Sequence, residues 1–316
     1  MTEIVFVYGE KRSDMTSVTG ARSVPEAEFV TRIDDLLEKG IPDKVIPWSA
    51  EEPPLWVRGF RPRLIIDLGS GKGGFIRSVL LRLGQWDCLD KLERVVLVES
   101  DKALSPDGKN GVRATLVRRI RSTLLEVGKP AVRVDVVLEP IQLDKVGAGN
   151  QKVIRVLEPY YDADLIVASH VTYYFGDGSG QELVRTLCER YLSGFGRIWC
   201  VIRKRGCPIY EARARTLRTL GTDDIKPFDY AEYFESAMLP MLPGVCVHAA
   251  DDKHYLSDAR KVGRFDAAYL LMWREAPPAI STPEVEAVSG IMDESVPLFA
   301  ERHFILGRVD ANRLEK

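Results

Sequence analysis

The residues 63–75, RLIIDLGSGKGGF, are those best suited by type and spacing to hold a reactive ligand. A short apolar run leads into the acid Asp67, and glycines follow at Gly69, Gly71 and Gly74. Glycines between a buried strand and a helix let the chain turn sharply and let a ligand approach the backbone closely. The stretch therefore predicts a ligand-binding turn with a carboxylate beside it.

Two kinds of cofactor fit this glycine spacing, and charge separates them. The three glycines satisfy the G-x-G-x-x-G fingerprint of a nicotinamide dinucleotide, but they also suit S-adenosylmethionine (SAM). Asp67, two positions before the first glycine, would repel a pyrophosphate, whereas SAM carries a cationic ammonium and sulfonium. Glu99 ends the next apolar run and could bind the ribose of either cofactor. A turn needed only for backbone geometry is the third alternative, and Asp67 favours SAM.

A phosphate-binding P-loop does not fit the same residues. That motif requires Ser or Thr directly after its lysine, and here Lys72 is followed by Gly73. The spacing from an earlier glycine is also wrong for the motif. The loop is therefore not expected to bind a nucleoside triphosphate.

The composition of the chain excludes several broad classes of protein. Its 316 residues are 45% hydrophobic and 28% charged, with a net charge of −2, so no nucleic-acid partner is expected. The five cysteines show no C-x-x-C pair, which predicts neither a bound metal nor a disulfide framework. No apolar window reaches the roughly 18 residues of a membrane span, and the first residues do not resemble a signal peptide. A cytoplasmic protein is expected, and its oligomeric state is left open.

Strand-like and helix-like patterns alternate along most of the chain. Apolar runs predict strands over 63–67, 94–100, 131–139, 162–170, 196–204, 244–256 and 302–309. Helical spacing predicts helices over 23–42, 74–85, 111–127, 179–192 and 222–238. This alternation predicts an α/β fold with a doubly wound, mostly parallel seven-stranded sheet and a site at the carboxyl ends of the strands.

The patterns also suggest how one continuous domain is divided. Residues 1–60 are predicted to form an N-terminal helical cap, and residues 61–206 the cofactor-binding core. Residues 207–316 are predicted to supply helical segments that cover the substrate and the last two strands.

Three of these stretches, DLGSGKGG, VVLVES and DADLIVASH, together resemble a class I SAM-dependent methyltransferase over residues 63–204. The resemblance implies a Rossmann-like methyltransferase fold with SAM as its cofactor. It also implies which residues bind the cofactor. The methionine part would contact Asp67, Gly69, Ser70 and Gly71, the ribose Glu99 with Ser100 beside it, and the adenine Ile141 or Gln142, while Ser169 would end the fourth strand beside the cofactor.

The stretch SHVTYYFGDG, which follows the fourth strand, is similar to the histamine N-methyltransferase group of small-molecule methyltransferases. Tyr173 and Tyr174 match a tyrosine pair of that group, and His170 stands where the group has a glutamine. The resemblance implies that these three residues are catalytic and that Phe175 lines the substrate pocket. An acid near the start of the N-terminal helix, Glu28 or Glu26, would pair with a substrate ammonium, and Glu301 lies just ahead of the last predicted strand.

The expected function is therefore transfer of a methyl group from SAM to a nitrogen of a small amine or imidazole-like metabolite. The acceptor could instead be an oxygen or carbon of a specialised metabolite. A nicotinamide-dependent oxidoreductase, and a methyltransferase fold that binds SAM without transferring the methyl group, are further alternatives. In the first reading His170, with an ordinary pKa near 6.5, would accept or relay a proton from the acceptor.

Overall fold

The computed structural model describes residues 46–71, 73–99, 112–138, 155, 157–169, 183–207, 211, 231–242, 244–254 and 299–308. Its strands are β1 (Leu64–Leu68), β2 (Arg94–Glu99), β3 (Arg133–Leu138), β4 (Ala163–Ser169), β5 (Leu192–Arg203), β6 (Val245–His254) and β7 (Phe299–Arg308). Its longer helices are α2 (Gly74–Gln85) and α3 (Val112–Glu126), and a short α7 (Ala231–Tyr233) runs into further turns η7 (Phe234–Met238) and η8 (Leu239–Met241). Two more short turns are η2 (Leu55–Val57) and η5 (Leu187–Tyr191).

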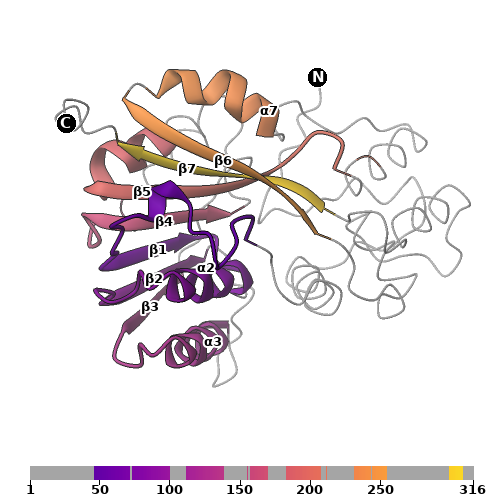
Figure 1. Cartoon of the computed structure of the whole chain (residues 1–316). Helices are drawn as coiled ribbons and strands as arrows, with labels where there is room; N and C mark the ends of the chain where they lie inside the picture. Colours follow the sequence, from indigo (N-terminus) through magenta and orange to yellow (C-terminus); the bar gives the residue numbers. More distant parts are fainter. Residues whose placement is uncertain are drawn as a thin grey trace, which may run out of the picture.

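These strands form one sheet in the order β3-β2-β1-β4-β5-β7-β6 (Figure 1). Strands β1 to β5 pair in parallel, whereas β7 lies antiparallel between β5 and β6. The chain reverses direction along the sheet after β3, which is the mark of a doubly wound sheet. The predicted fold, a doubly wound and mostly parallel seven-stranded Rossmann-like sheet, is confirmed.

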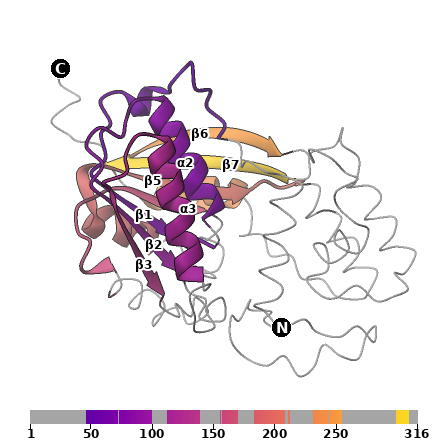
Figure 2. The same cartoon turned by 90° about the horizontal axis from the view of Figure 1, so that it is seen from below.

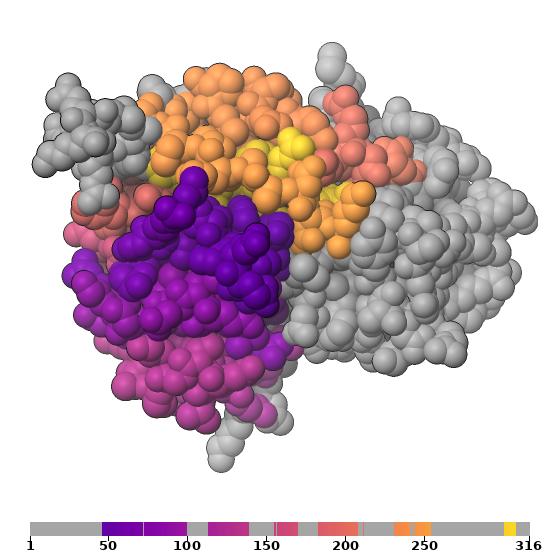
Figure 3. Space-filling view, viewed as in Figure 1, coloured from indigo at the N-terminus to yellow at the C-terminus, as the bar shows by residue number. Residues whose placement is uncertain are grey.

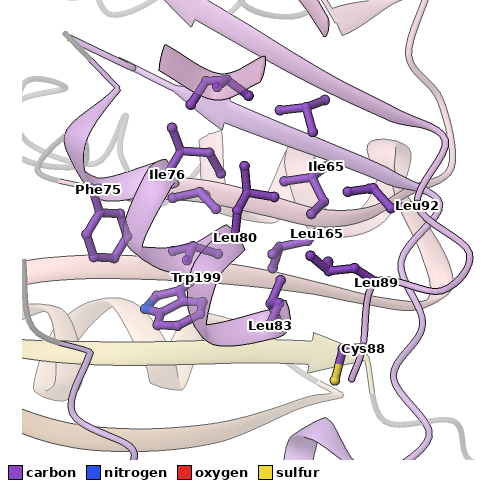
Figure 4. Close-up of a cluster of buried hydrophobic side chains, with 14 of the residues drawn as sticks. Ile65, Phe75, Ile76, Leu80, Leu83, Cys88, Leu89, Leu92, Leu165 and Trp199 are labelled. Atoms are coloured by element: carbon purple, nitrogen blue, oxygen red, sulfur yellow. The ribbon is translucent and has the colours of Figure 1, made fainter. Parts of the chain in front are cut away.

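Both faces of the sheet are covered, because the strands are apolar on both sides. Helices α2 and α3 lie across one face (Figure 2). There they pack on every second side chain of the strands, and the side chains in between point to the other face. Figure 4 shows this layer, in which Leu80 and Leu83 of α2 share one apolar cluster with Ile65, Leu165 and Trp199 of the sheet. The opposite face packs on η5 and η7, through Tyr191 and Phe234 among others.

Element boundaries agree with the sequence patterns from β1 to β4 and differ at the starts of β5 and β7. Helix α2 spans 74–85 as predicted. Strand β5 begins at Leu192 rather than residue 196, and β7 begins at Phe299 rather than residue 302. Glu301 was expected ahead of the last strand, but it lies within β7, where it pairs with Arg203 of β5 and Asp252 of β6.

The segment before β1 contributes to the core more than its sequence indicates. Residues 47–62 look like a proline- and tryptophan-rich connection, yet Trp56, Val57 and Phe60 are buried against α2 and the sheet. The backbone carbonyl of Trp48 accepts a hydrogen bond from Arg82 of α2, and the Trp86 indole donates to the carbonyl of Ser49. In the space-filling view the indigo surface of this part of the chain abuts the orange surface of residues 231–254 (Figure 3).

The predicted division into a cap, a core and covering segments stays a prediction. Most of the predicted N-terminal cap, 1–45, and most of the predicted substrate-covering segments lie outside the described residues. The boundaries at 60 and 206 therefore stay predictions. Within the described part of the chain, no helix has the length and apolar character needed to cross a membrane.

Candidate functional site

The glycine loop between β1 and α2 needs glycine at three positions. Gly69, Gly71 and Gly73 all have positive φ, at 70°, 50° and 79°, which side chains with a Cβ adopt only at a cost. Gly73 caps α2, and an added Cβ there would lie 3.1 Å from Leu116 of α3. Gly74, the third glycine of the fingerprint, is already helical, and no atom of the described residues lies within 4 Å of an added Cβ.

Backbone amides of this loop donate to acceptors within the protein. The amides of Gly69 and Ser70 both donate to the carbonyl of Val98, at 2.8 and 3.2 Å, and the amide of Gly73 donates to the carbonyl of Ser70. The amide of Gly71 donates to Oε2 of Glu99 over 2.6 Å. These contacts tie the loop to the end of β2.

Two carboxylates are buried where β1 and β2 end. Asp67 is 3% exposed and Glu99 is 6% exposed, although acidic side chains are rarely so deeply buried. Asp67 lies next to Leu97 and Val167 in the sheet, on the face that α2 covers. Both acids adjoin the glycine turn, Asp67 in β1 before it and Glu99 through its contact with the Gly71 amide, and their role in binding a cofactor stays a prediction.

Ser169 ends β4, the strand on the other side of β1. Its hydroxyl oxygen is buried and has no hydrogen-bond partner among the described residues. Because a buried hydroxyl without a partner is costly, it indicates a ligand, a water or a neighbour outside those residues.

A second polar group of residues lies at the carboxyl end of β5 and on the antiparallel strands beside it. His303 of β7 is fully buried, and its Nδ1 accepts a hydrogen bond of 3.1 Å from the indole of Trp199 of β5. Glu301 and Asp252 are also buried, at 5% and 9% exposed, and are direct neighbours across β7 and β6. Phe75, in the first turn of α2, packs on both Trp199 and His303.

Some predicted site residues are brought together and others cannot be placed. The structure gathers Asp67, Gly69, Ser70, Gly71 and Glu99 around one loop and puts Ser169 at the end of the adjacent strand. The remaining predicted residues lie outside the described part of the chain: Glu28, Ser100, Gln142, His170, Tyr173, Tyr174 and Phe175.

Sequence reasoning missed His303, Trp199 and Phe75 as neighbours of the loop. Phe75 directly follows the glycines, but its partners are more than 100 residues away along the chain. A single histidine in the apolar run of β7 was the only local signal.

Neither metal nor thiol chemistry is indicated by the described residues. Among them, no three His, Cys, Asp or Glu side chains are grouped so as to hold a metal ion. Burial raises the pKa of Cys88 to about 11 and also raises the pKa of Cys200. Because the thiolate is the reactive form, both side chains act as small buried hydrophobic groups.

No protein-family model matches the chain, and no curated protein matches it in sequence. Several solved structures are similar to the chain, at low sequence identity and low TM-score. The methyltransferase domain of the bacterial protein CtHen1 is 11% identical with a TM-score of 0.41, covering 80% of this chain and 93% of that one. A methyltransferase from Geobacter sulfurreducens is 15% identical with a TM-score of 0.34, covering 72% and 85%. A precorrin-6y C5,15-methyltransferase from Geobacter metallireducens is 12% identical with a TM-score of 0.33, covering 80% and 84%. Because these TM-scores are all below 0.5, the fold is assigned from the order and directions of the strands.

Proposed function

We propose that this protein is a SAM-dependent methyltransferase that methylates a nitrogen of a small amine or imidazole-like metabolite. The observation that carries the proposal is the contact between the Gly71 amide and the Glu99 carboxylate, with Asp67 buried nearby. It brings a carboxylate to the backbone position that the pyrophosphate of a dinucleotide would approach.

Charge favours a cationic ligand at this edge of the sheet. A unit charge about 4 Å from a carboxylate gains or loses roughly 4 kcal/mol at an effective dielectric constant near 20. SAM would present its ammonium and sulfonium to Asp67 and Glu99, whereas a pyrophosphate would be repelled by both. The difference exceeds what a single ordinary hydrogen bond contributes.

The loop also lacks two features of a dinucleotide site. In such a site the second glycine lets the pyrophosphate approach the backbone, but here the amide of Gly71 is already bonded to Glu99. The third glycine allows close packing of helix on strand, but an added Cβ at Gly74 would contact none of the described residues. A nicotinamide cofactor is therefore the weaker proposal.

The residues present fit SAM. Asp67 and the loop would hold the ammonium, the first amides of α2 would meet the carboxylate of the methionine part, and Glu99 would accept the ribose hydroxyls. The buried hydroxyl of Ser169 would find its missing partner on the ligand. Ser100 and Gln142 are proposed beside the ribose and the adenine. SAM, when bound, supplies an already activated methyl group, so the chain has only to hold the acceptor in line with it.

The acceptor site is proposed from the residues that follow β4. His170 would take or relay a proton from an acceptor that arrives protonated, and Tyr173 and Tyr174 would orient it. Phe175 would line the pocket, since aromatic faces attract cations, and Glu28 would pair with a substrate ammonium.

The test is acceptor-dependent formation of S-adenosylhomocysteine from SAM in fractionated small-metabolite extracts. We expect product only in fractions that contain the acceptor, and mass spectrometry of that acceptor identifies the methylated atom. An oxygen or carbon product would replace the nitrogen proposal, while SAM binding without turnover in any fraction would contradict methyl transfer.

A variant pair tests the role of His170 in that assay. His170→Ala is expected to lower turnover by at least about tenfold while leaving the affinity for SAM unchanged, because proton transfer is lost and cofactor binding is not. His248→Ala, in the amino-terminal half of β6, is the matched control and should leave turnover unchanged. Equal turnover of the two variants would remove His170 from the mechanism.

A further inference from the structure

His303 belongs to a group of aromatic rings that is centred on Trp199 and reaches the first turn of α2. It is fully buried in β7, and its imidazole centroid lies 6.1 Å from the rings of both Trp48 and Trp199 and 5.9 Å from Phe75. These three rings come from the segment before β1, from β5 and from α2. One side chain thus contacts three separate parts of the structure.

A hydrogen bond orients this imidazole. A tryptophan indole can only donate, so the contact from Trp199 makes Nδ1 of His303 an acceptor. Nε2, on the other side of the ring, lies 3.9 Å from Oδ2 of Asp252. His303 therefore has one orientation, held from β5 on one side and facing β6 on the other.

The contact with Phe75 connects this group to the loop. Phe75 is the second residue of α2, two positions after the left-handed Gly73 that caps the helix. Its ring meets Trp199 edge to face at 5.8 Å, and Figure 4 shows it at the start of α2. The loop is tied to β2 through Val98 and Glu99, so Phe75 is its attachment on the opposite side, toward β5 and β7.

We propose that His303 is a positioning residue of the methyl-donor site: by holding Phe75 against Trp199 it sets the first turn of α2 and, through it, the glycine loop. This inference depends on the proposed function, because the ligand whose affinity it controls is SAM. A purely apolar side chain would fill the same volume but would leave the Trp199 indole buried without an acceptor, which is costly. Small displacements of groups that position a ligand have large effects on binding and turnover.

The experiment measures the dissociation constant and the KM for SAM in the full-length chain. His303→Leu, which removes the acceptor, is expected to weaken SAM binding about tenfold. His303→Asn keeps an acceptor atom at the same position along the side chain and is expected to stay within about twofold of the natural protein. Ile305→Val, two residues along the same face of β7, is the control: it lowers stability by removing a buried methyl group and should leave SAM affinity unchanged.

The outcomes separate this inference from the proposed function. If the natural protein does not bind SAM, the proposed function fails. If the natural protein binds SAM and His303→Leu binds it equally well, or if His303→Asn is as weak as His303→Leu, the positioning role is wrong. Should His303→Leu not fold, Trp199→Phe removes the same hydrogen bond from the donor side. Trp199→Phe must then weaken SAM binding several-fold, and unchanged binding overturns the inference.

Discussion

The parallel and the antiparallel half of the sheet place their buried polar side chains differently. The short strands β1 and β2 have apolar side chains on both faces, and their buried acids lie at their carboxyl ends: Asp67 is the penultimate residue of β1 and Glu99 the last residue of β2. On β7 and β6, ten-residue antiparallel strands carry His303 and Asp252 within the buried part of the sheet itself. The first half offers polar groups to a ligand, whereas the second uses polar groups to fix its own packing.

This difference indicates a division of labour within the site. The loop between β1 and α2 has the backbone geometry of a binding element, and on the β5 side it is attached to the sheet through Phe75. The antiparallel half supplies that attachment through Trp199, His303 and Phe75. Changes in the first half should therefore act on binding directly, and changes in the second half through position or stability.

The largest expected effect in this comparison is at the glycine loop. Gly73→Ala places a Cβ at a φ of 79° and 3.1 Å from Leu116, and should lower the free energy of unfolding by about 1–2 kcal/mol. Gly74→Ala is the matched control, because that residue is helical and its added Cβ would contact none of the described residues; it should raise the free energy by about 0.5–1 kcal/mol. Urea unfolding midpoints with unchanged slopes measure both. Similar effects at the two positions would show that the loop does not have this conformation.

A smaller effect is expected from the ion pairs on the outer side of the antiparallel half. Arg302 donates to Asp251 and to Glu235 of η7, and Lys204, the residue after β5, contacts the same Asp251. The hydrogen bond from Arg302, aided by that from Lys204, lowers the pKa of Asp251 from 3.8 to about 2. Because the folded pKa lies below the unfolded one, the stabilisation is complete above pH 4 and is lost as pH falls toward 2.

Asp251→Asn tests that pH dependence. The pair is half exposed, so the loss at neutral pH should be under about 1 kcal/mol. The difference in melting temperature between the natural protein and the variant should be constant from pH 7 to about 4 and should shrink toward pH 2. Asp162→Asn, an exposed acid before β4, is the control. A difference that grows on acidification would contradict the assigned sign.

The sequence predicted the parallel half of the fold and its loop well, because those features are local. An apolar run, an acid and glycines in succession were enough to place β1, α2 and Asp67, and the end of β2 gave Glu99. The antiparallel half was harder, since β7 pairs with strands far away in the chain and its start depends on that pairing. Glu301 was placed outside the strand for this reason.

The same locality explains what was missed at the site. Nothing near His303 in the sequence indicates Trp199 or Phe75, which the sheet register and the start of α2 bring to it. The buried role of Trp56 was hidden because proline-rich surroundings usually mark an exposed connection. Such contacts come from tertiary packing, which overrides local pattern.

We propose that the carboxylates beside the glycine loop select a cationic cofactor, and isothermal titration of SAM and NADH into the 316-residue protein tests this selection most directly. We expect SAM to bind and NADH to give no saturable heat. Asp67→Asn should lower the affinity for SAM by at least about tenfold, whereas Asp162→Asn, at an exposed position, should leave that affinity unchanged. Tighter binding of NADH than of SAM, or full SAM affinity in Asp67→Asn, would contradict the account.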